Sequence, residues 1–530
     1  MTEAGQNVDP VTIQIFRNLF QSVAEEMGVA LVRTSYSPNI KERRDSSCAV
    51  FDGSGRLVAQ AAHIPVHLGA MPFSVRAAIQ RYTLEPGDAV ILNDPFLGGT
   101  HLPDITIVSP VYISDEPGAK PFGYVASRAH HADVGGMTPG SIPMSTELYQ
   151  EGIIIPPVKL VERGVIHEGI LELICRNSRM PDERRGDLSA QLAAHRVGEA
   201  RLVDIVRKYG PEETGFYLGA LIDYAERLTR ASVAKIPDGV YEFVDHMDDD
   251  GNGDEPVRIQ VRITVRGDEV EVDFTGTSPQ RPGPVNAVLA VTTSATLYVM
   301  RCLGDERVPA NHGCLIPVKI VAPPGTVVNA LSPAAVNGGN TETSQRITDV
   351  LIGAFGQALP DLMPAAGQGT MNNVAFGGID PFRNQQYAYY ETIGGGMGGS
   401  PTSDGLTGVH VHMSNTLNTP VEALEFAFPL RVEEYSIRRG TGGAGRHKGG
   451  DGLRRSLRFL APTSLTILSE RRRFPPYGAR GGSPGQPGRN TVRRTGQAPE
   501  ALRSKVTIAL NEGDTIVIES PGGGGWGEPT

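Results

Sequence analysis

The stretch FLGGTHLPDITIV, residues 96–108, combines a turn, two side chains of metal-binding type and the start of a strand. Its Gly-Gly pair is typical of a turn, and Pro103 disfavours a helix and cannot donate a ladder hydrogen bond. On a regular strand, His101 and Asp104 would point to opposite faces because they are three residues apart. We expect instead a bent segment that leads into a strand from residue 104, in which the two side chains can converge.

A second polar cluster, SRAHHADVGG at residues 127–136, follows about one strand later and supplies His130, His131 and Asp133. A further carboxylate, Asp45, precedes another expected strand. Neutral imidazole and carboxylate groups suit zinc, manganese or iron(II), and an open site of three or four such ligands is typical of catalytic metals. The alternative is that these residues only bind backbone groups at strand ends.

Two other histidine pairs allow a functional and a structural interpretation. His63 and His67, in HIPVHLGAMP, could line the site or bind substrate, or could serve in a turn before a helix. We expect a strand over residues 408–415, GVHVHMSN, in which His410 and His412 share one face, either as a metal pair or as a solvated or half-buried strand face.

The periodicity of apolar residues predicts both helices and strands. A helix is expected over residues 10–34, begun by Asp9-Pro10, and CAVFDGSGRLVAQ reads as a hairpin. Residues 186–210 and 211–235 predict an antiparallel helical pair, and alternation over residues 238–276 predicts strands. Further expected elements are strands over 87–94, 122–130 and 464–472 and helices over 286–303 and 343–358.

These elements predict an α+β, multi-domain protein of mixed sheets with packed helices and a β-rich, glycine-rich C-terminal portion. With 530 residues, the chain is too long for one compact core. We expect an N-terminal α+β metal-site region, a helical pair, an α+β middle region and a β-rich, glycine-rich C-terminal region, at residues 1–185, 186–236, 237–365 and 366–530.

Composition excludes several classes of protein. A net charge of −10 argues against a nucleic-acid partner, and the absence of any run of 18 apolar residues argues against a membrane span. The four cysteines are scattered without a CxxC pair, which argues against a cysteine zinc site and a disulfide scaffold. The first ten residues do not resemble a secretory signal, so we expect a cytoplasmic location.

Motifs for nucleotide chemistry are missing from the sequence. It contains no GxxxxGK[ST] phosphate loop and no GxGxxG between a strand and a helix, so ATP chemistry would come from another chain. GTGGAGRHKGGDG, residues 440–452, could cradle an anion or could form glycine turns. PGGGGWGEP, residues 521–529, holds the only tryptophan, Trp526, which we expect to be docked rather than exposed.

Taken in order, a series of motifs resembles the hydantoinase B/oxoprolinase family over nearly the whole chain from about residue 10. They are SPNIKERRDSSCAVFD, HIPVHLGAMP, NDPFLGGTHLPDITIV, RAHHADVGGMTPGS, GDLSAQLAA, DGLTGVHVHMSNTLNTPVEALE, RRRFPPYGARGG and SPGGGGWGEP. The resemblance implies a subunit of an ATP-dependent amidohydrolase that opens a cyclic amide such as a hydantoin, 5-oxoproline or another lactam. It also implies a partner, a hydantoinase A-like ATPase of actin-like fold, which binds ATP and magnesium and phosphorylates the amide oxygen.

The resemblance further implies a divalent metal, zinc, manganese, iron or cobalt, held by His101, Asp104 and His130, with Asp45 as a further ligand. His131 is the alternative to His130 as a ligand, and His131, His67 and Asp133 are candidate catalytic residues; Asp133 or Asp45 could position water or take its proton. A heterotetramer of two copies of each subunit is expected. The rival interpretations are a ketone carboxylase subunit, related to acetone and acetophenone carboxylases, and a non-catalytic scaffold that shapes the partner's channel.

Overall fold

The computed structural model describes residues 8–62, 64–114, 116, 118–305 and 307–529. Within these ranges the strands form four sheets, and helices pack on their faces, which confirms the expected α+β class. The helices of the described part are all too short or too polar to cross a membrane.

The N-terminal third is built around a seven-stranded sheet in the order β2-β1-β5-β4-β3-β6-β7. Every neighbouring pair in it is antiparallel. The central strands β1, β4 and β5 are buried along their whole length, so side chains of both faces face a core. The strands are β1 (Ser46–Asp52), β2 (Leu57–Ala62), β3 (Ala89–Leu92), β4 (Asp104–Val111), β5 (Gly123–His130), β6 (Val158–Glu162) and β7 (Val165–Ile166).

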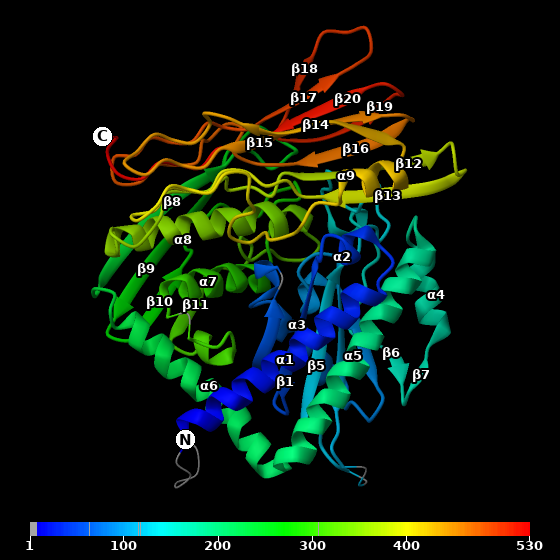
Figure 1. The fold of residues 1–530 in the computed structure, drawn as a ribbon, viewed down its shortest axis with the longest axis vertical. Helices are drawn as coiled ribbons and strands as arrows, with labels where there is room; N and C mark the ends of the chain where they lie inside the picture. Colours follow the sequence, from blue (N-terminus) through cyan, green and yellow to red (C-terminus); the bar gives the residue numbers. More distant parts are fainter. Residues whose placement is uncertain (1–7, 63, 115, 117, 306, 530) are drawn as a thin grey trace.

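Helices cover both faces of this sheet. Cys48 and Val50 of β1 join a core with α1 (Pro10–Thr34) and α5 (Pro181–Tyr209), which lie side by side in Figure 1. The alternate residues Ala49 and Phe51 pack with α3 (Met71–Arg81) on the other face. The predicted bounds of α1 are confirmed, because the Asp9 carboxylate accepts a hydrogen bond from the Thr12 amide at 2.8 Å and starts the helix.

The predicted helical pair corresponds to α5 and α6 (Pro211–Val233), which are joined at Gly210. Gly210 has φ 86°, so the chain turns sharply there. In Figure 1 the two helices form a V: α5 follows α1, whereas α6 leads away toward the middle region. Two further short helices, α2 (Pro38–Lys41) and α4 (Glu168–Arg176), flank this part of the molecule.

The middle region contains a four-stranded sheet in the order β11-β10-β9-β8. Burial alternates along β9, as the sequence pattern predicted, because one face packs on α8 and the other faces outward. The elements are β8 (Gly239–Met247), β9 (Val257–Arg266), β10 (Glu269–Asp273), β11 (Val318–Val321), α7 (Leu289–Leu303) and α8 (Ser344–Ala358).

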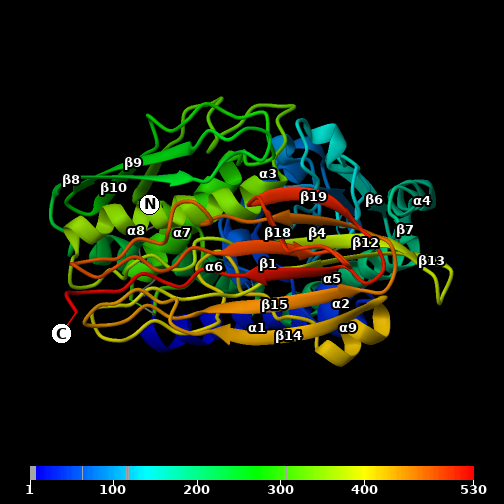
Figure 2. The ribbon, with the colours of Figure 1, turned by 90° about the horizontal axis from the view of Figure 1, so that it is seen from above.

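Two C-terminal sheets lie as layers over the rest of the molecule (Figures 1 and 2). Their inner faces share one core, in which Phe376 packs edge-on against Phe459 with ring centroids 5.3 Å apart. One sheet is β13 (Gln385–Glu391), β12 (Asn373–Asp380), β16 (Thr463–Leu468) and β19 (Lys505–Leu510); the other is β14 (Leu430–Arg438), β15 (Gly452–Phe459), β20 (Thr515–Glu519), β17 (Arg489–Arg493) and β18 (Glu500–Leu502), with α9 (Val421–Ala427) beside them.

Glycine-rich loops beyond these sheets pack backbone against backbone. The amide of Gly443 donates to the carbonyl of Gly523 at 2.8 Å, and a Cβ atom on Gly523 would lie 2.1 Å from the carbonyl oxygen of Met397. Only glycine permits so close an approach. The segment 440–452 therefore contacts other glycine loops, and Trp526, 7% exposed and hydrogen-bonded through its backbone to His447, is docked as expected.

The largest cluster of buried apolar residues extends from Ile64 to Met413 in the sequence. It joins the N-terminal sheet to the middle region, because residues of β4, β9, α7 and α8 all contribute to it. The division into four domains at the boundaries given above stays a prediction.

Candidate metal centre

The histidine cluster forms where β4 begins and β5 ends. Asp104 pairs directly with His130 in the register of these two antiparallel strands. His101 lies in the preceding turn, and its carbonyl accepts a hydrogen bond from the Asp104 amide at 3.1 Å. Gly98, with φ 105°, lets the chain enter this turn. The predicted bent segment therefore brings the side chains of His101, Asp104 and His130 together, where β4 begins and β5 ends.

Three imidazoles surround the carboxylate of Asp104. Its Oδ1 atom lies 3.1 Å from Nε2 of His101 and 3.3 Å from Nδ1 of His130. Its Oδ2 atom lies 3.4 Å from Nε2 of His67. One ligand atom each from His101, Asp104 and His130 lies within 4.8 Å of the others, so a single cation could contact all three.

Unpartnered nitrogen atoms show that these residues fit a metal. Both ring nitrogens of His101 and Nε2 of His130 have no hydrogen-bond partner among the described residues, because the approach of His101 to Asp104 lacks hydrogen-bond geometry. The side chains of His101 and Asp104 are only 0% and 1% exposed. A buried polar atom without a partner costs about 1–3 kcal/mol, a cost that a cation ligated here would remove. Two imidazoles and a carboxylate are a donor set typical of zinc, manganese or iron.

The surroundings of the cluster favour an ionised Asp104 and a neutral His130. Burial alone would raise the pKa of Asp104, but the neighbouring His101 and His67 outweigh burial and hold that pKa well below its usual range. Burial lowers the pKa of His130, which keeps that imidazole neutral. A neutral imidazole and an ionised carboxylate are the forms that ligate a metal.

Neighbouring side chains hold the cluster in place. Thr100 donates from Oγ1 to Oδ2 of Asp104 at 2.9 Å, and Nδ1 of His67 lies 3.0 Å from Oγ of Ser47. The ring of Tyr390, on β13, stacks on His130 with centroids 4.6 Å apart. Such contacts orient the ligand side chains.

A π-helical turn contributes a contact that sequence reasoning missed. The turn η5, Gly339–Thr343, precedes α8, and Asn340 donates from Nδ2 to Oδ2 of Asp104 at 3.3 Å. A Cβ atom on Gly339 would lie 1.8 Å from the carbonyl oxygen of Asn286, so glycine is required for the turn to reach this place. π-helical turns are frequent at functional sites. The only sequence signal was the polar run NGGNTET before an amphipathic helix.

Asp45 lies next to the cluster, outside the group of three ligands. Its backbone carbonyl accepts a hydrogen bond from the amide of His130 at 3.0 Å, and its negative charge acts on the His130 imidazole. Its side chain is buried. The role of Asp45 as a further ligand stays a prediction.

His131 and Asp133 are directed away from the cluster. Nε2 of His131 lies 3.0 Å from Oε1 of Gln191, on α5. The carboxylate of Asp133 accepts hydrogen bonds from the guanidinium of Arg179 at 3.0 Å and from the amide of Gly135 at 3.1 Å. Their catalytic roles stay predictions, and the structure brings neither of them to Asp104.

The expected strand over residues 408–415 is wrong. Among the described residues only an isolated bridge, between Gly395 and Val409, occurs there, and His412 has φ 55°, which no strand tolerates. His410 and His412 therefore do not share a strand face. Nδ1 of His410 lies 2.8 Å from Oγ of Ser414. His63 lies outside the described residues.

Known proteins resemble this chain over almost its whole length. The sequence pattern of Hydantoinase B/oxoprolinase matches residues 9–529. The chain is 42% identical over 528 residues to the uncharacterized protein MJ0963 of Methanocaldococcus jannaschii, covering 98% of this chain and 91% of that protein. It is 40% identical to 5-oxoprolinase 1 of Arabidopsis thaliana over 99% of this chain but only 42% of that protein. A putative D-/L-hydantoinase subunit of a Pseudomonas species is 33% identical, with 99% of this chain and 91% of that protein covered.

Two solved structures share the fold. The ATP-dependent caprolactamase of Pseudomonas jessenii superposes with a TM-score of 0.89 and 27% identity, over 99% of this chain and 92% of that one. Acetone carboxylase, at 17% identity, superposes with a TM-score of 0.90 over 98% of this chain and 76% of that one, and supports the fold alone. With a matching pattern from residue 9 to residue 529 and relatives of this similarity, the chain belongs to the Hydantoinase B/oxoprolinase family.

Proposed function

We propose that this chain is the metal-binding subunit of an ATP-dependent enzyme that hydrolyses a cyclic amide. The observation that supports the proposal most strongly is the buried cluster of His101, Asp104 and His130, with three ring nitrogens that have no partner among the described residues. These residues would hold a divalent zinc, manganese, iron or cobalt ion, with Asp45 as a further ligand. When bound there, such an ion would lower the pKa of a water molecule to about 7, so that hydroxide is available near neutral pH.

The chain's own residues would hold the ligand side chains in position and exclude water from them. His67, Thr100 and Asn340 all contact Oδ2 of Asp104, so Oδ1 stays directed at His101 and His130. The cluster is buried, and a charge interaction is stronger in a site from which water is excluded. This arrangement would support attack on an amide that has already been activated.

Glu151 is a better candidate for a proton-transferring group than Asp133. Its Oε1 atom accepts hydrogen bonds from Ser145 and from the amide of Val336, whereas its Oε2 atom has no partner among the described residues. Burial raises the pKa of Glu151 to about 7, and its charge also interacts with His101. A group that titrates near neutral pH can both take and return a proton. Asp133, by contrast, is occupied by Arg179.

ATP would be bound by a separate subunit. The chain covers about nine tenths of the Pseudomonas hydantoinase subunit but only 42% of 5-oxoprolinase 1, whose additional length leaves room for an activating domain. An ordinary amide is a poor electrophile, so a hydantoinase A-like ATPase of actin-like fold would phosphorylate its oxygen, with ATP and magnesium. We propose a heterotetramer of two copies of each subunit in the cytoplasm, where ATP is abundant.

Reconstitution with the partner tests this proposal. We would purify the chain together with an actin-like ATPase encoded beside it and follow ring opening of hydantoin, 5-oxoproline, 2-pyrrolidone and caprolactam with ATP. Activity should need both proteins, and light scattering should give the mass of the heterotetramer. Full ATP-dependent ring opening by the ATPase alone would contradict the proposal. Glu151→Gln should lower kcat and remove one limb of the pH profile without changing metal content.

The rival functions are tested in the same experiment. A ketone carboxylase subunit would support ATP turnover only when bicarbonate and a ketone such as acetone are supplied. A scaffold would keep ring-opening activity in the complex after Asp104→Ala. Ring opening without bicarbonate that disappears in Asp104→Ala would support the hydrolase over both rivals.

A further inference from the structure

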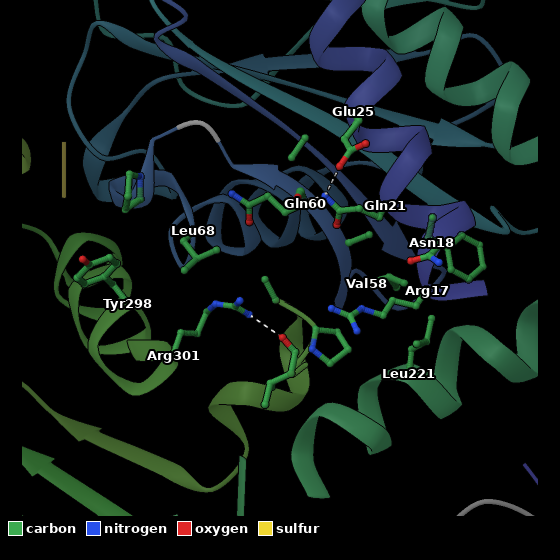
Figure 3. A pocket seen from close by; sticks show the side chains of 17 residues that line it. Arg17, Asn18, Gln21, Glu25, Val58, Gln60, Leu68, Leu221, Tyr298 and Arg301 are labelled. Atoms are coloured by element: carbon green, nitrogen blue, oxygen red, sulfur yellow. Dashed lines mark hydrogen bonds between the residues drawn. The ribbon is translucent and has the colours of Figure 1, made fainter. Parts of the chain in front are cut away.

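A cavity of about 550 Å³ lies beside the candidate metal centre and takes no part in it. It is bounded by α1, the edge strand β2, the C-terminal end of α7 and residues 308–310 (Figure 3). This volume is within the range of about 300–1,000 Å³ that small-molecule sites occupy.

Two arginines from opposite walls give this cavity a cationic centre. Arg17, on α1, and Arg301, on α7, extend toward one another in Figure 3. Their hydrogen bonds are to neutral oxygens, Oε1 of Gln14 at 3.4 Å and the carbonyl of Val308 at 3.2 Å. Within the described ranges neither guanidinium forms an ion pair, so both can receive an anion. Among the lining residues that the structure describes, the one acidic residue, Glu25, is exposed.

Gln60, on β2, also lines the cavity, and its backbone carbonyl accepts a hydrogen bond from Nε2 of Gln21 at 3.2 Å. Its side-chain amide has no hydrogen-bond partner among the described residues, but both amide atoms are buried and closed off from the cavity. The guanidinium groups of Arg17 and Arg301 are therefore the charged donors that an oxyanion in the cavity would meet.

The short segment around His67 connects the cavity with the histidine cluster. Pro65 and Leu68 line it, and both flank His67 in the short 3-10 helix η1, Pro65–His67, whose histidine contacts Asp104. On the opposite wall, the hydroxyl of Tyr298 lies 3.4 Å from Nδ1 of His412. A ligand held here would therefore be a neighbour of the candidate centre.

We propose that Arg17 and Arg301 form a binding site for the oxyanion of a small molecule, a carboxylate or a phosphoryl group. This inference rests on the proposed function: the group is either a carboxylate carried by the lactam or the phosphoryl group that activation adds to it. Arginine binds both oxyanions through two parallel N–H donors, which gives orientation as well as affinity. The site would select anionic or activated substrates over neutral ones.

Titration calorimetry of the full chain tests the site without any activity assay. The probes are inorganic phosphate, 5-oxoproline and 2-pyrrolidone; the last two differ only by the carboxylate. We expect phosphate, 5-oxoproline or both to bind, and 2-pyrrolidone to bind at least tenfold more weakly. Arg17→Gln and Arg301→Gln should each weaken oxyanion binding at least tenfold. Arg33→Gln, on the exposed side of the same helix α1, is the matched control and should change nothing.

Each outcome supports or overturns the site. Binding of 5-oxoproline alone assigns the site to a substrate carboxylate, and binding of phosphate assigns it to the phosphoryl group. No binding of either oxyanion to the wild-type chain, or equal binding by the wild type and both glutamine variants, would overturn the proposal. If thermal unfolding shows that the glutamine variants are misfolded, Arg17→Lys and Arg301→Lys keep the charge but lose the two-donor geometry. These two lysine variants should bind the oxyanion at least threefold more weakly than the wild type. Wild-type affinity in both variants would overturn the proposal.

These measurements are independent of the proposed metal function. A chain that binds metal and opens neutral lactams but no oxyanion would refute the cavity site and leave the metal-binding function intact. A chain that binds oxyanions at Arg17 and Arg301 but no metal would support the cavity site and refute the metal-binding function.

Discussion

Two buried polar regions lie at successive parts of one helical segment and differ in how their charges are balanced. At the π-helical turn before α8, Asn340 contacts the histidine cluster around Asp104. Further along, α8 itself carries Arg346 and Asp349 into a network of ion pairs. The first region leaves ring nitrogens without partners among the described residues, whereas the second pairs charge with opposite charge.

The ion-pair network joins the middle region to the C-terminal sheets. Nη1 of Arg346 lies 2.9 Å from Oδ2 of Asp245, on β8, and 3.2 Å from Oδ2 of Asp349. Arg471, three residues after the end of β16, pairs with the same two aspartates, and Lys505 of β19 pairs with Glu470. Buried charges that are paired in this way hold elements from different sheets in one arrangement.

The difference separates a structural role from a ligand-binding role. Burying a charged or polar group is tolerated when a protein partner satisfies it. The network meets that condition for its charges, which pair with groups of opposite charge from four segments, although Nε of Arg346 and of Arg471 and Oδ1 of Asp349 have no hydrogen-bond partner among the described residues. The cluster does not, because His101 keeps both ring nitrogens unpaired among the described residues. A region that is buried and left unsatisfied indicates where a ligand belongs.

The largest effect is expected from His101→Ala. Removing this ligand should abolish bound metal and lower ring-opening activity of the complex roughly 10³-fold, equivalent to about 4 kcal/mol in the barrier. Elemental analysis and the reconstituted assay measure both effects. His195→Gln is the control: His195 is also buried, but its two nitrogens lie 2.8 and 2.9 Å from Ser109 and Ser127. Wild-type metal content in His101→Ala would show that the histidine cluster does not hold the metal.

A large loss of stability is expected from Arg346→Met. The substitution leaves Asp245 and Asp349 with one guanidinium between them, and breaking a buried pair in this way costs about 3 kcal/mol. Urea unfolding measures the loss, while bound metal should stay at the wild-type level. The control is Arg262→Met, which breaks an exposed pair with Glu242 and should cost less than about 1 kcal/mol. Equal costs in the two variants would show that the network does not stabilise the fold.

A moderate effect is expected from Asn340→Ala. Loss of the hydrogen bond to Asp104 should weaken metal affinity about 10–100-fold, because groups that orient a ligand typically contribute that much. Competition with a chelator of known affinity gives the value. Asn252→Ala, on an exposed turn, is the control and should bind metal as the wild type does. Unchanged affinity in Asn340→Ala would separate the π-helical turn from the metal centre.

The smallest effect is an acid sensitivity that His195 should cause. Burial lowers the pKa of His195 to about 3, so the folded protein keeps the residue neutral while the unfolded chain binds a proton below about pH 6.5. The contribution of His195 to the free energy of unfolding is therefore fully present above pH 6.5. It is lost as the pH falls toward 3, by about 2 kcal/mol at pH 5.

Urea unfolding of His195→Gln at pH 7.5 and pH 5 measures this contribution. The difference in stability between the two pH values should be smaller than in the wild type by about 1–2 kcal/mol. His167→Gln removes an exposed histidine and should leave the difference unchanged. An identical acid sensitivity in wild type and His195→Gln would show that the buried histidine is not its source.

Local elements of the fold could be predicted from the sequence. The helix over residues 10–34 follows from the spacing of apolar residues and from the Asp9 cap, and the strands of residues 104–111 and 123–130 follow from composition. The segment 408–415 failed because alternation alone does not exclude a residue of positive φ such as His412. Short patterns predict local conformation only where no tertiary contact overrides it.

Part of the candidate site could also be predicted from the sequence. His101 and Asp104 could be proposed together because only two residues separate them and Pro103 bends the chain. The resemblance already favoured His130 over His131, and the strand register gives the physical reason, since neighbouring residues on a strand point to opposite faces. Asn340 is 236 positions from Asp104, and no local pattern could connect them.

By itself the sequence determined the longer helices, the strands between residues 46 and 130 and between residues 239 and 273, the types of the candidate ligand residues and the family, because each is written in short-range spacing or in the order of motifs. Tertiary structure decided which imidazoles meet Asp104, that Asp133 is bound by Arg179 instead, and that Arg17 and Arg301 face one cavity. Those outcomes depend on strand register and on packing between segments hundreds of residues apart, which side-chain periodicity does not encode.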